Sequence, residues 1–207
     1  GQAMIGILDY GAGNVQAIAR IYNNLKIPNK LIKSSSDFEG VEKLILPGVG
    51  SFDAVVSKLN ESGLKNRLSE MVLIEKTPVF GICVGLQIMA KSSEEGTLPG
   101  LGWINATVKK FNLPSEYYVP HMGWNTFSLS GANDLFNGTD DELGFYFVHT
   151  YYFDLEEEID STARTTYGIE FTSAIRKGNI MATQFHPEKS HSNGVTLLKN
   201  FAEQDIC

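Results

Sequence analysis

The sequence predicts an α/β fold with a mostly parallel central sheet flanked by helices. Short apolar runs typical of buried strands alternate with segments that have the spacing of amphipathic helices. Short glycine-rich links join them, and this alternation indicates βαβ units and a parallel sheet. After residue 100 the segments become β-rich with turn residues between them, so we expect added antiparallel strands in the C-terminal half.

The composition is that of an ordinary globular protein and argues against several functional classes. The 207 residues carry a net charge of −7, which disfavours nonspecific binding to nucleic acid or to an acidic membrane. No apolar run approaches the ~20 residues of a membrane span, and no signal-peptide pattern precedes Met4. Two cysteines, Cys83 and Cys207, form no disulfide framework, so we expect a reducing, cytoplasmic compartment.

The chain is predicted to form a single domain over residues 4–204. A chain of this length can bury a substantial core, and no repeat or linker divides it. Residues 1–3 precede Met4 and resemble a remnant of cloning, so they are left out of the fold prediction.

The first half supplies four predicted strands and their helices. Strands are expected at residues 4–10, 30–33, 41–46 and 78–82, and helices at residues 15–25, 53–59, 64–74 and 86–90. Gly11 and Gly13 follow the first strand, but the third glycine of a dinucleotide fingerprint is missing. A tight strand-to-helix connection is therefore favoured over a nucleotide site.

The second half is predicted to consist of β-rich segments and a closing helix. The β-rich segments are residues 103–111, 117–127, 145–153, 162–174 and 180–185. Apolar residues at helical spacing over residues 193–203 predict the helix.

Cys83 lies at the most informative turn in the chain. An apolar strand leads into it, Gly81 and Gly85 flank it, and a helical segment follows. Such a strand–turn–helix exposes a nucleophile on a sharp bend, where a helix N-terminus favours the thiolate. The alternative interpretation is a buried cysteine in an ordinary turn.

A cysteine nucleophile needs a base, and the base needs an orienting group. His186 ends an apolar strand as Cys83 does, and Glu188 is close enough in sequence to hold the imidazole tautomer. Because parallel sheets bind ligands at the carboxyl ends of their strands, Cys83 and the loop at residues 47–50 can face one crevice. His121 and His149 are interpreted as structural.

Acyl transfer also needs hydrogen-bond donors where negative charge develops on oxygen. Residues 47–50 (PGVG) end a predicted strand, and the peptide N–H groups of Val49 and Gly50 could act there with that of Val84. A plain turn would also contain Pro-Gly, so this motif is weak when taken alone.

Three of these stretches resemble the signatures of the class I glutamine amidotransferase family, in the same order and spacing. They are residues 81–87 (GICVGLQ), 46–50 (LPGVG) and 184–190 (QFHPEKS). Further stretches resemble the branch formed by the glutaminase subunits of imidazole glycerol phosphate synthases, namely residues 9–14 (DYGAGN), 120–125 (PHMGWN) and 145–151 (FYFVHTY). Together they cover the chain from residue 4 to about residue 202.

The resemblance implies a flavodoxin-like class I glutamine amidotransferase fold and a glutaminase with no cofactor and no metal. Cys83 would attack the side-chain amide of glutamine, His186 would transfer protons, and Glu188 would orient the imidazole. By matching positions, the residues that contact bound glutamine would be Gln87, Glu95, Thr150 and Tyr151. Those facing a partner would be Asn14, Trp124, Tyr146 and Lys189.

The partner implied by the resemblance is a (β/α)8 cyclase subunit, which forms a heterodimer with the glutaminase and receives its ammonia. Together they would make imidazole glycerol phosphate and an aminoimidazole carboxamide nucleotide in histidine biosynthesis. His191 instead resembles a paralogous branch that supplies ammonia to a surface-polysaccharide sugar amidotransferase. Two other classes stay open: a cysteine peptidase or amidase on the same scaffold, and a non-catalytic binding module.

Overall fold

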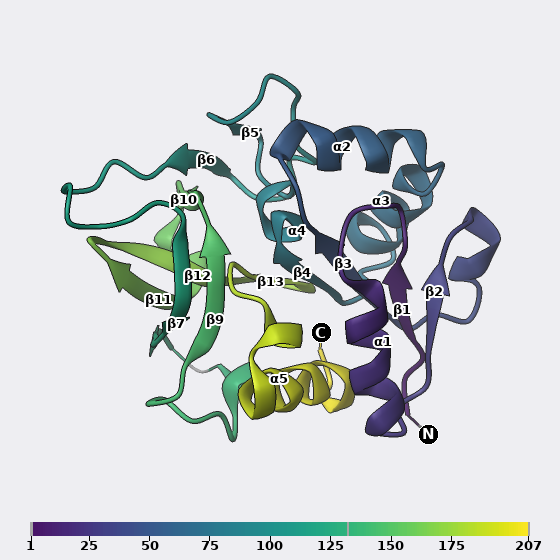
Figure 1. Cartoon of the computed structure of the whole chain (residues 1–207). Coiled ribbons are helices and arrows are strands. Elements are labelled where there is room, and N and C mark those ends of the chain that lie inside the picture. Colours follow the sequence, from purple (N-terminus) through teal and green to yellow (C-terminus); the bar gives the residue numbers. More distant parts are fainter. Residues whose placement is uncertain (1, 132, 207) are drawn as a thin grey trace.

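The computed structural model describes residues 2–131 and 133–206, and Figure 1 shows their arrangement. The first half contains β1 (Ile5–Leu8), α1 (Val15–Asn24), β2 (Asn29–Ile32), β3 (Lys43–Gly48), α2 (Phe52–Glu61), α3 (Lys65–Leu73), β4 (Val79–Cys83) and α4 (Val84–Gln87). The second half contains β5 (Ser92–Ser93), β6 (Ala106–Lys110), β7 (His121–Asn125), β8 (Ser128–Leu129), β9 (Phe145–His149), β10 (Tyr151–Leu155), β11 (Ser161–Tyr167), β12 (Ile169–Lys177), β13 (Ile180–Thr183) and α5 (His191–Glu203).

The main sheet is parallel at one end and mostly antiparallel at the other, as the sequence predicts. Its strand order is β2-β1-β3-β4-β13-β12-β10-β6-β5. The first five strands pair in parallel, and the pairs from β13 to β6 are antiparallel. Strands β11 and β8 continue from β12, while β7 and β9 form a separate two-stranded sheet. The antiparallel strands therefore extend the parallel core.

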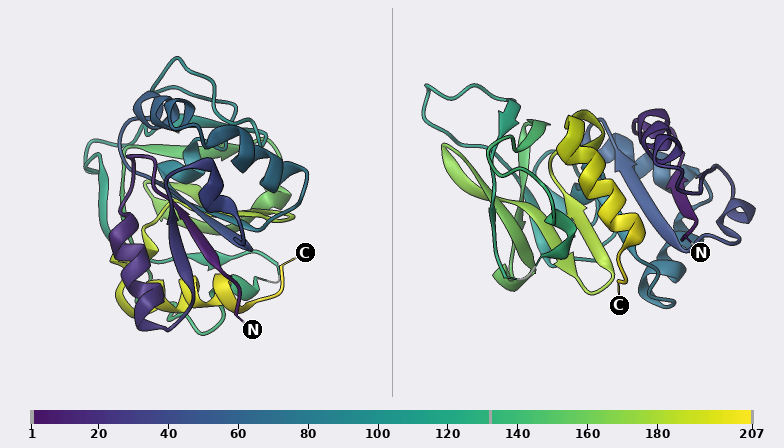
Figure 2. Two further views of the ribbon diagram at one scale, coloured as in Figure 1. Left: turned by 90° about the vertical axis from the view of Figure 1, so that its right-hand side faces the viewer. Right: turned by 90° about the horizontal axis from the view of Figure 1, so that it is seen from below.

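Helices cover both faces of the parallel strands. In the left view of Figure 2, α1 and α5 lie on one side of these strands and α2 and α3 on the other. Strands β1, β3, β4 and β13 are buried along their whole length, as expected for strands covered on both faces. This layering leaves the carboxyl ends of the strands as the place where loops can form a site.

The helix after Cys83 is shorter than predicted. Instead of residues 86–90, α4 covers a single turn, Val84–Gln87. The carbonyl oxygens of Ile88, Met89 and Ala90 accept hydrogen bonds from the N–H groups of residues 101, 104 and 102, respectively. These carbonyls therefore anchor a following loop, and the apolar 88–90 segment is buried without continuing the helix.

Two predicted β-rich segments each contain two strands. Residues 145–153 divide at Thr150 into β9, in the small sheet, and β10, in the main sheet. Residues 162–174 lie in the antiparallel pair β11–β12, which turns at Gly168 with φ 73°. A positive φ favours glycine, so this turn was readable from the sequence. The divergence at Thr150 was not, because residues 145–155 contain no glycine or proline to mark the end of one strand and the start of the next.

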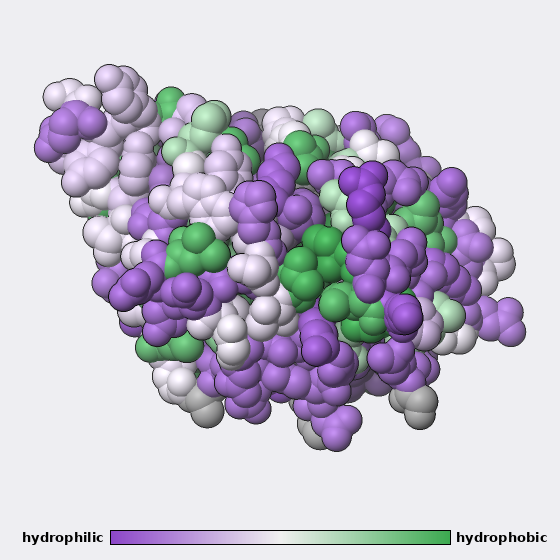
Figure 3. Space-filling view, turned by 60° about the horizontal axis from the view of Figure 1, so that its bottom comes forward, coloured by the Kyte–Doolittle hydropathy of each residue, from purple (hydrophilic) through white to green (hydrophobic). Residues whose placement is uncertain are grey.

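Three further features of the described chain concern its helices, its cysteines and its surface. No helix in the described part of the chain is long and apolar enough to cross a membrane. Cys83 is a free thiol, while Cys207, like Gly1, lies outside the described residues. On the face shown in Figure 3, apolar residues emerge as separate groups among hydrophilic ones.

Candidate active site

Cys83 is the last residue of β4 and has a backbone conformation that non-glycine residues rarely adopt. Its φ is 55° and its ψ −110°, and its side chain is 5% exposed. Strained backbone of this kind persists where the surrounding packing over-determines it. Here a β-carbon added to Gly85 would lie 2.0 Å from the carbonyl oxygen of Leu46, so the turn packs directly on the backbone of β3. The predicted sharp turn is present.

His186 reaches the same edge of the sheet from β13. Because β13 pairs in parallel with β4, the two strands end side by side, and the chain continues from β13 into His186. The Nδ1 atom of His186 lies 3.1 Å from the Oε2 atom of Glu188, and both side chains are almost fully buried. Since a carboxylate only accepts, Nδ1 carries the proton in this contact. Glu188 therefore fixes the tautomer and the ring orientation.

The surroundings of His186 favour its charged form. Burial by itself would lower the pKa of His186, but hydrogen bonds to Cys83 and Glu188, together with their negative charge, raise it to about 10. The Oε1 atom of Glu188 is buried and has no hydrogen-bond partner among the described residues. Its negative charge is therefore directed mainly at the imidazole, which is ready to donate a proton at neutral pH.

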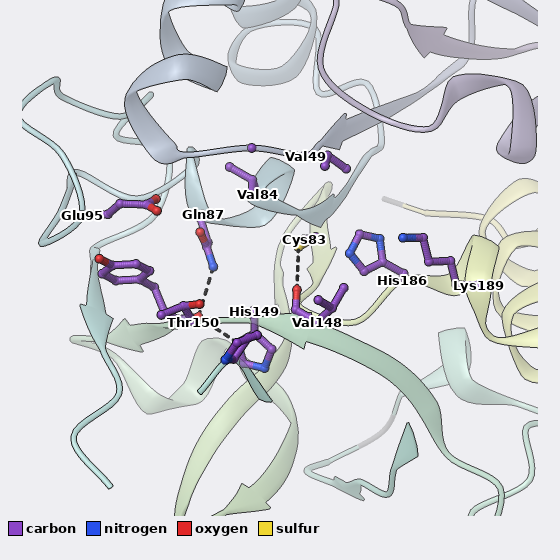
Figure 4. A pocket seen from close by; sticks show the side chains of 13 residues that line it. Val49, Cys83, Val84, Gln87, Glu95, Val148, His149, Thr150, His186 and Lys189 are labelled. Carbon is purple, nitrogen blue, oxygen red and sulfur yellow. Dashed lines mark hydrogen bonds between the residues drawn. The ribbon is translucent and has the colours of Figure 1, made fainter. Parts of the chain in front are cut away.

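A pocket of about 270 Å³ opens in front of Cys83. Figure 4 shows Gln87 and Glu95 on one side of Cys83, and His186 and Lys189 on the other. The remaining lining residues are Val49, Gly50, Val84, Pro120, Val148, His149, Thr150 and Tyr151. This volume is at the small end of ligand sites and suits a ligand of amino-acid size.

The residues predicted to supply an oxyanion site border this pocket. Val49 and Gly50 follow β3, whose Gly48 pairs with Cys83. Neither N–H group is hydrogen-bonded to another group of the described chain, so both are available as donors. Val84 begins α4, where the N–H groups of a first helical turn are also free of helical partners. Val49, Gly50 and Val84 thus line the same pocket as Cys83, and their role as oxyanion donors stays a prediction.

The four residues predicted to contact glutamine line the other side of the pocket. The Oε1 atom of Glu95 accepts a hydrogen bond of 2.7 Å from the N–H of Phe52, at the start of α2. The Nε2 atom of Gln87 donates to the carbonyl oxygen of Tyr151 at 3.2 Å. Thr150 and Tyr151 occupy the point where β9 gives way to β10. The pocket therefore offers a carboxylate and an amide to a polar ligand.

The four residues predicted to face a partner are exposed or half-buried. Trp124 and Tyr146 are a cross-strand pair of β7 and β9, with ring centroids 6.3 Å apart. Lys189 lines the pocket and is exposed, whereas Asn14 is an exposed residue just before α1. Trp124 is 41% exposed. All four are reachable from outside, although Lys189 alone borders the pocket itself.

A family model for class I glutamine amidotransferases matches residues 6–204. The chain belongs to the class I glutamine amidotransferase family. It is 50% identical over 202 residues to an imidazole glycerol phosphate synthase subunit HisH of Leptospira interrogans, covering 96% of this chain and 99% of the relative. It is 46% identical over 203 residues to the same subunit of Bdellovibrio bacteriovorus, covering 97% and 100% of the two chains.

The fold of this glutamine amidotransferase is also that of solved structures. A candidate GMP synthase component from Thermoplasma acidophilum superposes with a TM-score of 0.72, covering 98% of this chain and 93% of the other. At 23% sequence identity this likeness concerns the fold alone. Within the described residues, no group of His, Cys, Asp or Glu side chains could hold a metal ion.

Three residues of this glutamine amidotransferase were missed or underrated by sequence reasoning. Gln184 is fully buried and lies between Gln87 and Cys83, although its motif was read only for His186. His149 is buried, as a structural histidine should be, yet it also lines the pocket. His191 stacks on Trp124 with ring centroids 5.5 Å apart, so it belongs to the rim. In the sequence, Gln184 and His149 lie within stretches that resemble family signatures, and His191 was noted only for its resemblance to a paralogous branch.

Proposed function

We propose that this glutamine amidotransferase, folded as one domain over residues 4–204, is the glutaminase subunit of an imidazole glycerol phosphate synthase. Relatives that are 46–50% identical over nearly their whole length bear that subunit name. The observation that supports the chemical part is that Cys83, His186 and the loop residues Val49 and Gly50, whose N–H groups have no partner in the described chain, line one small pocket. Together they can cleave an amide bond.

In the first half-reaction, the sulfur of Cys83 forms a bond to the side-chain carbonyl carbon of glutamine. The carbonyl electron pair moves to oxygen, where the N–H groups of Val49, Gly50 and Val84 stabilise the charge. As the carbonyl re-forms, the carbon–nitrogen bond breaks, and the charged imidazole of His186 gives its proton to the nitrogen. Ammonia leaves, and a glutamyl thioester remains on the enzyme.

In the second half-reaction, neutral His186 takes a proton from water while the water oxygen bonds to the thioester carbon. The carbon–sulfur bond then breaks, its electron pair returns to the sulfur, and glutamate is released. The buried carboxylate of Glu188 stabilises the imidazolium that re-forms. No cofactor is required for either half-reaction.

The glutamate part of the substrate is proposed to bind at the opposite end of the pocket. The carboxylate of Glu95 complements an α-ammonium group, and the Oε1 atom of Gln87 has no hydrogen-bond partner within the described chain. Thr150 and Tyr151 complete the set. A free amino acid fits such a site better than an amide inside a peptide, because a peptide has no α-ammonium group at that point.

The partner is proposed to be a (β/α)8 cyclase that takes up the ammonia. The relatives are named as subunits of a synthase, which implies a second subunit. On β7, the large apolar side chains of Met122 and Trp124 are 61% and 41% exposed, as is common where a partner docks. Asn14, Tyr146 and Lys189 would join this contact. The surface-polysaccharide alternative is not favoured by these relatives.

Glutamate release from glutamine tests this proposal. The chain is mixed with a purified imidazole glycerol phosphate synthase cyclase subunit, with and without the nucleotide substrate of the cyclase. We expect release that needs the partner and disappears in Cys83→Ala, with the melting temperature of the variant close to that of the parent. Retained release in Cys83→Ala would contradict the proposed chemistry, and peptide hydrolysis without any response to glutamine would favour a peptidase.

A further inference from the structure

Gln184 is a fully buried polar residue beside the nucleophile. Its Nε2 atom lies 3.6 Å from the sulfur of Cys83, and its Oε1 atom lies 3.1 Å from the Nε2 atom of Gln87. We propose that the Gln184 side chain is a catalytic residue that donates a hydrogen bond to the Cys83 thiolate, held in the donating orientation by Gln87. This role rests on the proposed glutaminase chemistry.

The orientation of the Gln184 amide follows from a chain of contacts that starts at a backbone group. The carbonyl oxygen of Tyr151 can only accept, so the group that Gln87 turns toward it is the Nε2 amide nitrogen. The same nitrogen faces Gln184, and two donors would repel each other there. Gln184 therefore presents Oε1 to Gln87 and is left with Nε2 directed at the sulfur of Cys83. A reversed amide would break two contacts at once.

Gln184 can stabilise the Cys83 thiolate in a way that neither His186 nor the carbonyl group of Val148 can. His186 also faces the sulfur, but it is a proton donor and must give its proton away during the reaction. The carbonyl oxygen of Val148 lies 4.0 Å from the sulfur, at the outer limit for a hydrogen bond, and it offers no stabilisation to a negative charge. An amide N–H keeps its proton at neutral pH, so Gln184 can stabilise the thiolate before attack and again when the thioester is cleaved.

The contact is also sheltered from competing water. Gln184, Thr183 and Phe185 are all fully buried, and the N–H of Gln184 is bonded to the carbonyl oxygen of Ser173 at 2.9 Å. A hydrogen bond to a charged atom gains strength in such surroundings because the effective dielectric constant is low. The backbone of Gln184 is thus fixed, and its side chain has a single set of partners.

Alkylation of Cys83 with iodoacetamide across pH tests this proposal in the full chain carrying Cys207→Ser. Gln184→Met removes the donor at nearly constant length, and Gln184→Glu places a carboxylate beside the sulfur. We expect the pH of half-maximal alkylation to rise by about one unit in Gln184→Met and by more in Gln184→Glu. With the cyclase subunit present, kcat for glutamate release should fall about tenfold in Gln184→Met while KM changes less than threefold.

Two further variants make the result decisive. Asn66→Asp makes the same amide-to-carboxyl change at an exposed position of α3 and should leave the alkylation profile unchanged. Gln87→Met keeps Gln184 but removes the group that orients it, so it should shift the profile in the same direction by less. This second variant decides the question if Gln184→Met does not fold.

The outcomes separate this proposal from the proposed function. Profiles of Gln184→Met and Gln184→Glu that superpose on the parent would overturn the role of Gln184. Alkylation does not require glutamine turnover, so a parent protein that never releases glutamate would contradict the glutaminase function without hiding the alkylation result.

Discussion

The phenol hydroxyl of Tyr10 donates a hydrogen bond to the carbonyl oxygen of Pro47. Tyr10 follows β1 and is buried, and burial raises its pKa, so the hydroxyl keeps its proton. Pro47 lies two residues before Val49, the first of the proposed oxyanion donors. The loop after β1 also approaches closely, since a β-carbon on Gly13 would lie 2.6 Å from the β-carbon of Pro47. The loop after β1 therefore fixes the position of Pro47, at the start of the loop that carries Val49 and Gly50.

Removing this hydroxyl should impair catalysis more than binding. In Tyr10→Phe the carbonyl of Pro47 loses its partner, and we expect the loop with Val49 and Gly50 to sample positions in which its N–H groups miss the oxyanion. We expect kcat for glutamate release to fall about tenfold with little change in KM, and the protein to lose about 1 kcal/mol of stability. Steady-state kinetics and urea unfolding measure the two effects. A rise in KM at constant kcat would place Tyr10 in ligand binding instead.

The carboxylate of Glu188 should be needed to keep His186 charged at neutral pH. In Glu188→Gln the imidazole loses a negative neighbour, so its pKa should fall from about 10 toward the ordinary histidine value. We expect at least a tenfold loss of kcat, because less imidazolium is available to protonate the leaving nitrogen. Histidine proton resonances followed by NMR across pH report the midpoint. An unchanged midpoint would show that Cys83 alone sustains the charge.

A buried histidine pair should make the fold sensitive to acid. The Nδ1 atom of His121 lies 2.9 Å from the Nε2 atom of His149, whose own Nδ1 donates to the carbonyl oxygen of Tyr151 at 2.8 Å. Burial lowers the pKa of His121 to about 4 and that of His149 to about 3. Both rings are neutral in the folded state at pH 6, whereas unfolded histidines begin to bind protons below about pH 6.5.

The sign of the effect follows from these two pKa values. Because the folded values lie below the unfolded one, the stabilisation is complete above about pH 6.5 and is lost as pH falls toward 4. Each histidine should lower the free energy of unfolding by about 1 kcal/mol per pH unit in this window. Urea unfolding at several pH values should give a smaller slope for His121→Phe than for the parent. Equal slopes would mean that the pair is not neutral in the folded state.

The sequence predicted most of the parallel half of the fold and the chemical centre of the site. Glycine turns, apolar runs and the position of Cys83 are local features, and local features are what periodicity and turn chemistry can detect. The order of the parallel strands brings Cys83 and His186 together, 103 residues apart in the chain. The parallel pairing of β13 with β4 was not predicted, because residues 180–185 were expected among the antiparallel strands of the C-terminal half.

The features that were not predicted depend on contacts between distant segments. The helix after Cys83 ends early because the carbonyl oxygens of residues 88–90 accept hydrogen bonds from N–H groups of the loop at residues 101–104. Tyr10 and Gln184 lie within stretches that resemble family signatures, but no role was predicted for either, since their partners, Pro47 and Cys83, are fixed only by tertiary packing. The proposed roles of the oxyanion, glutamine-binding and partner-facing residues remain predictions for the experiments described above.

The close packing of Gly85 on Leu46 has a consequence for protein engineering. The geometry of the nucleophile is set by backbone against backbone, with no room for even one added carbon atom. Sequence libraries that vary Gly85 should therefore yield few folded proteins. The loop that carries Glu95 and the junction at Thr150 are built from exposed or half-buried side chains and leave more freedom. A redesign toward other amino-acid amides would begin there, with the turn at Cys83 kept as an unaltered part.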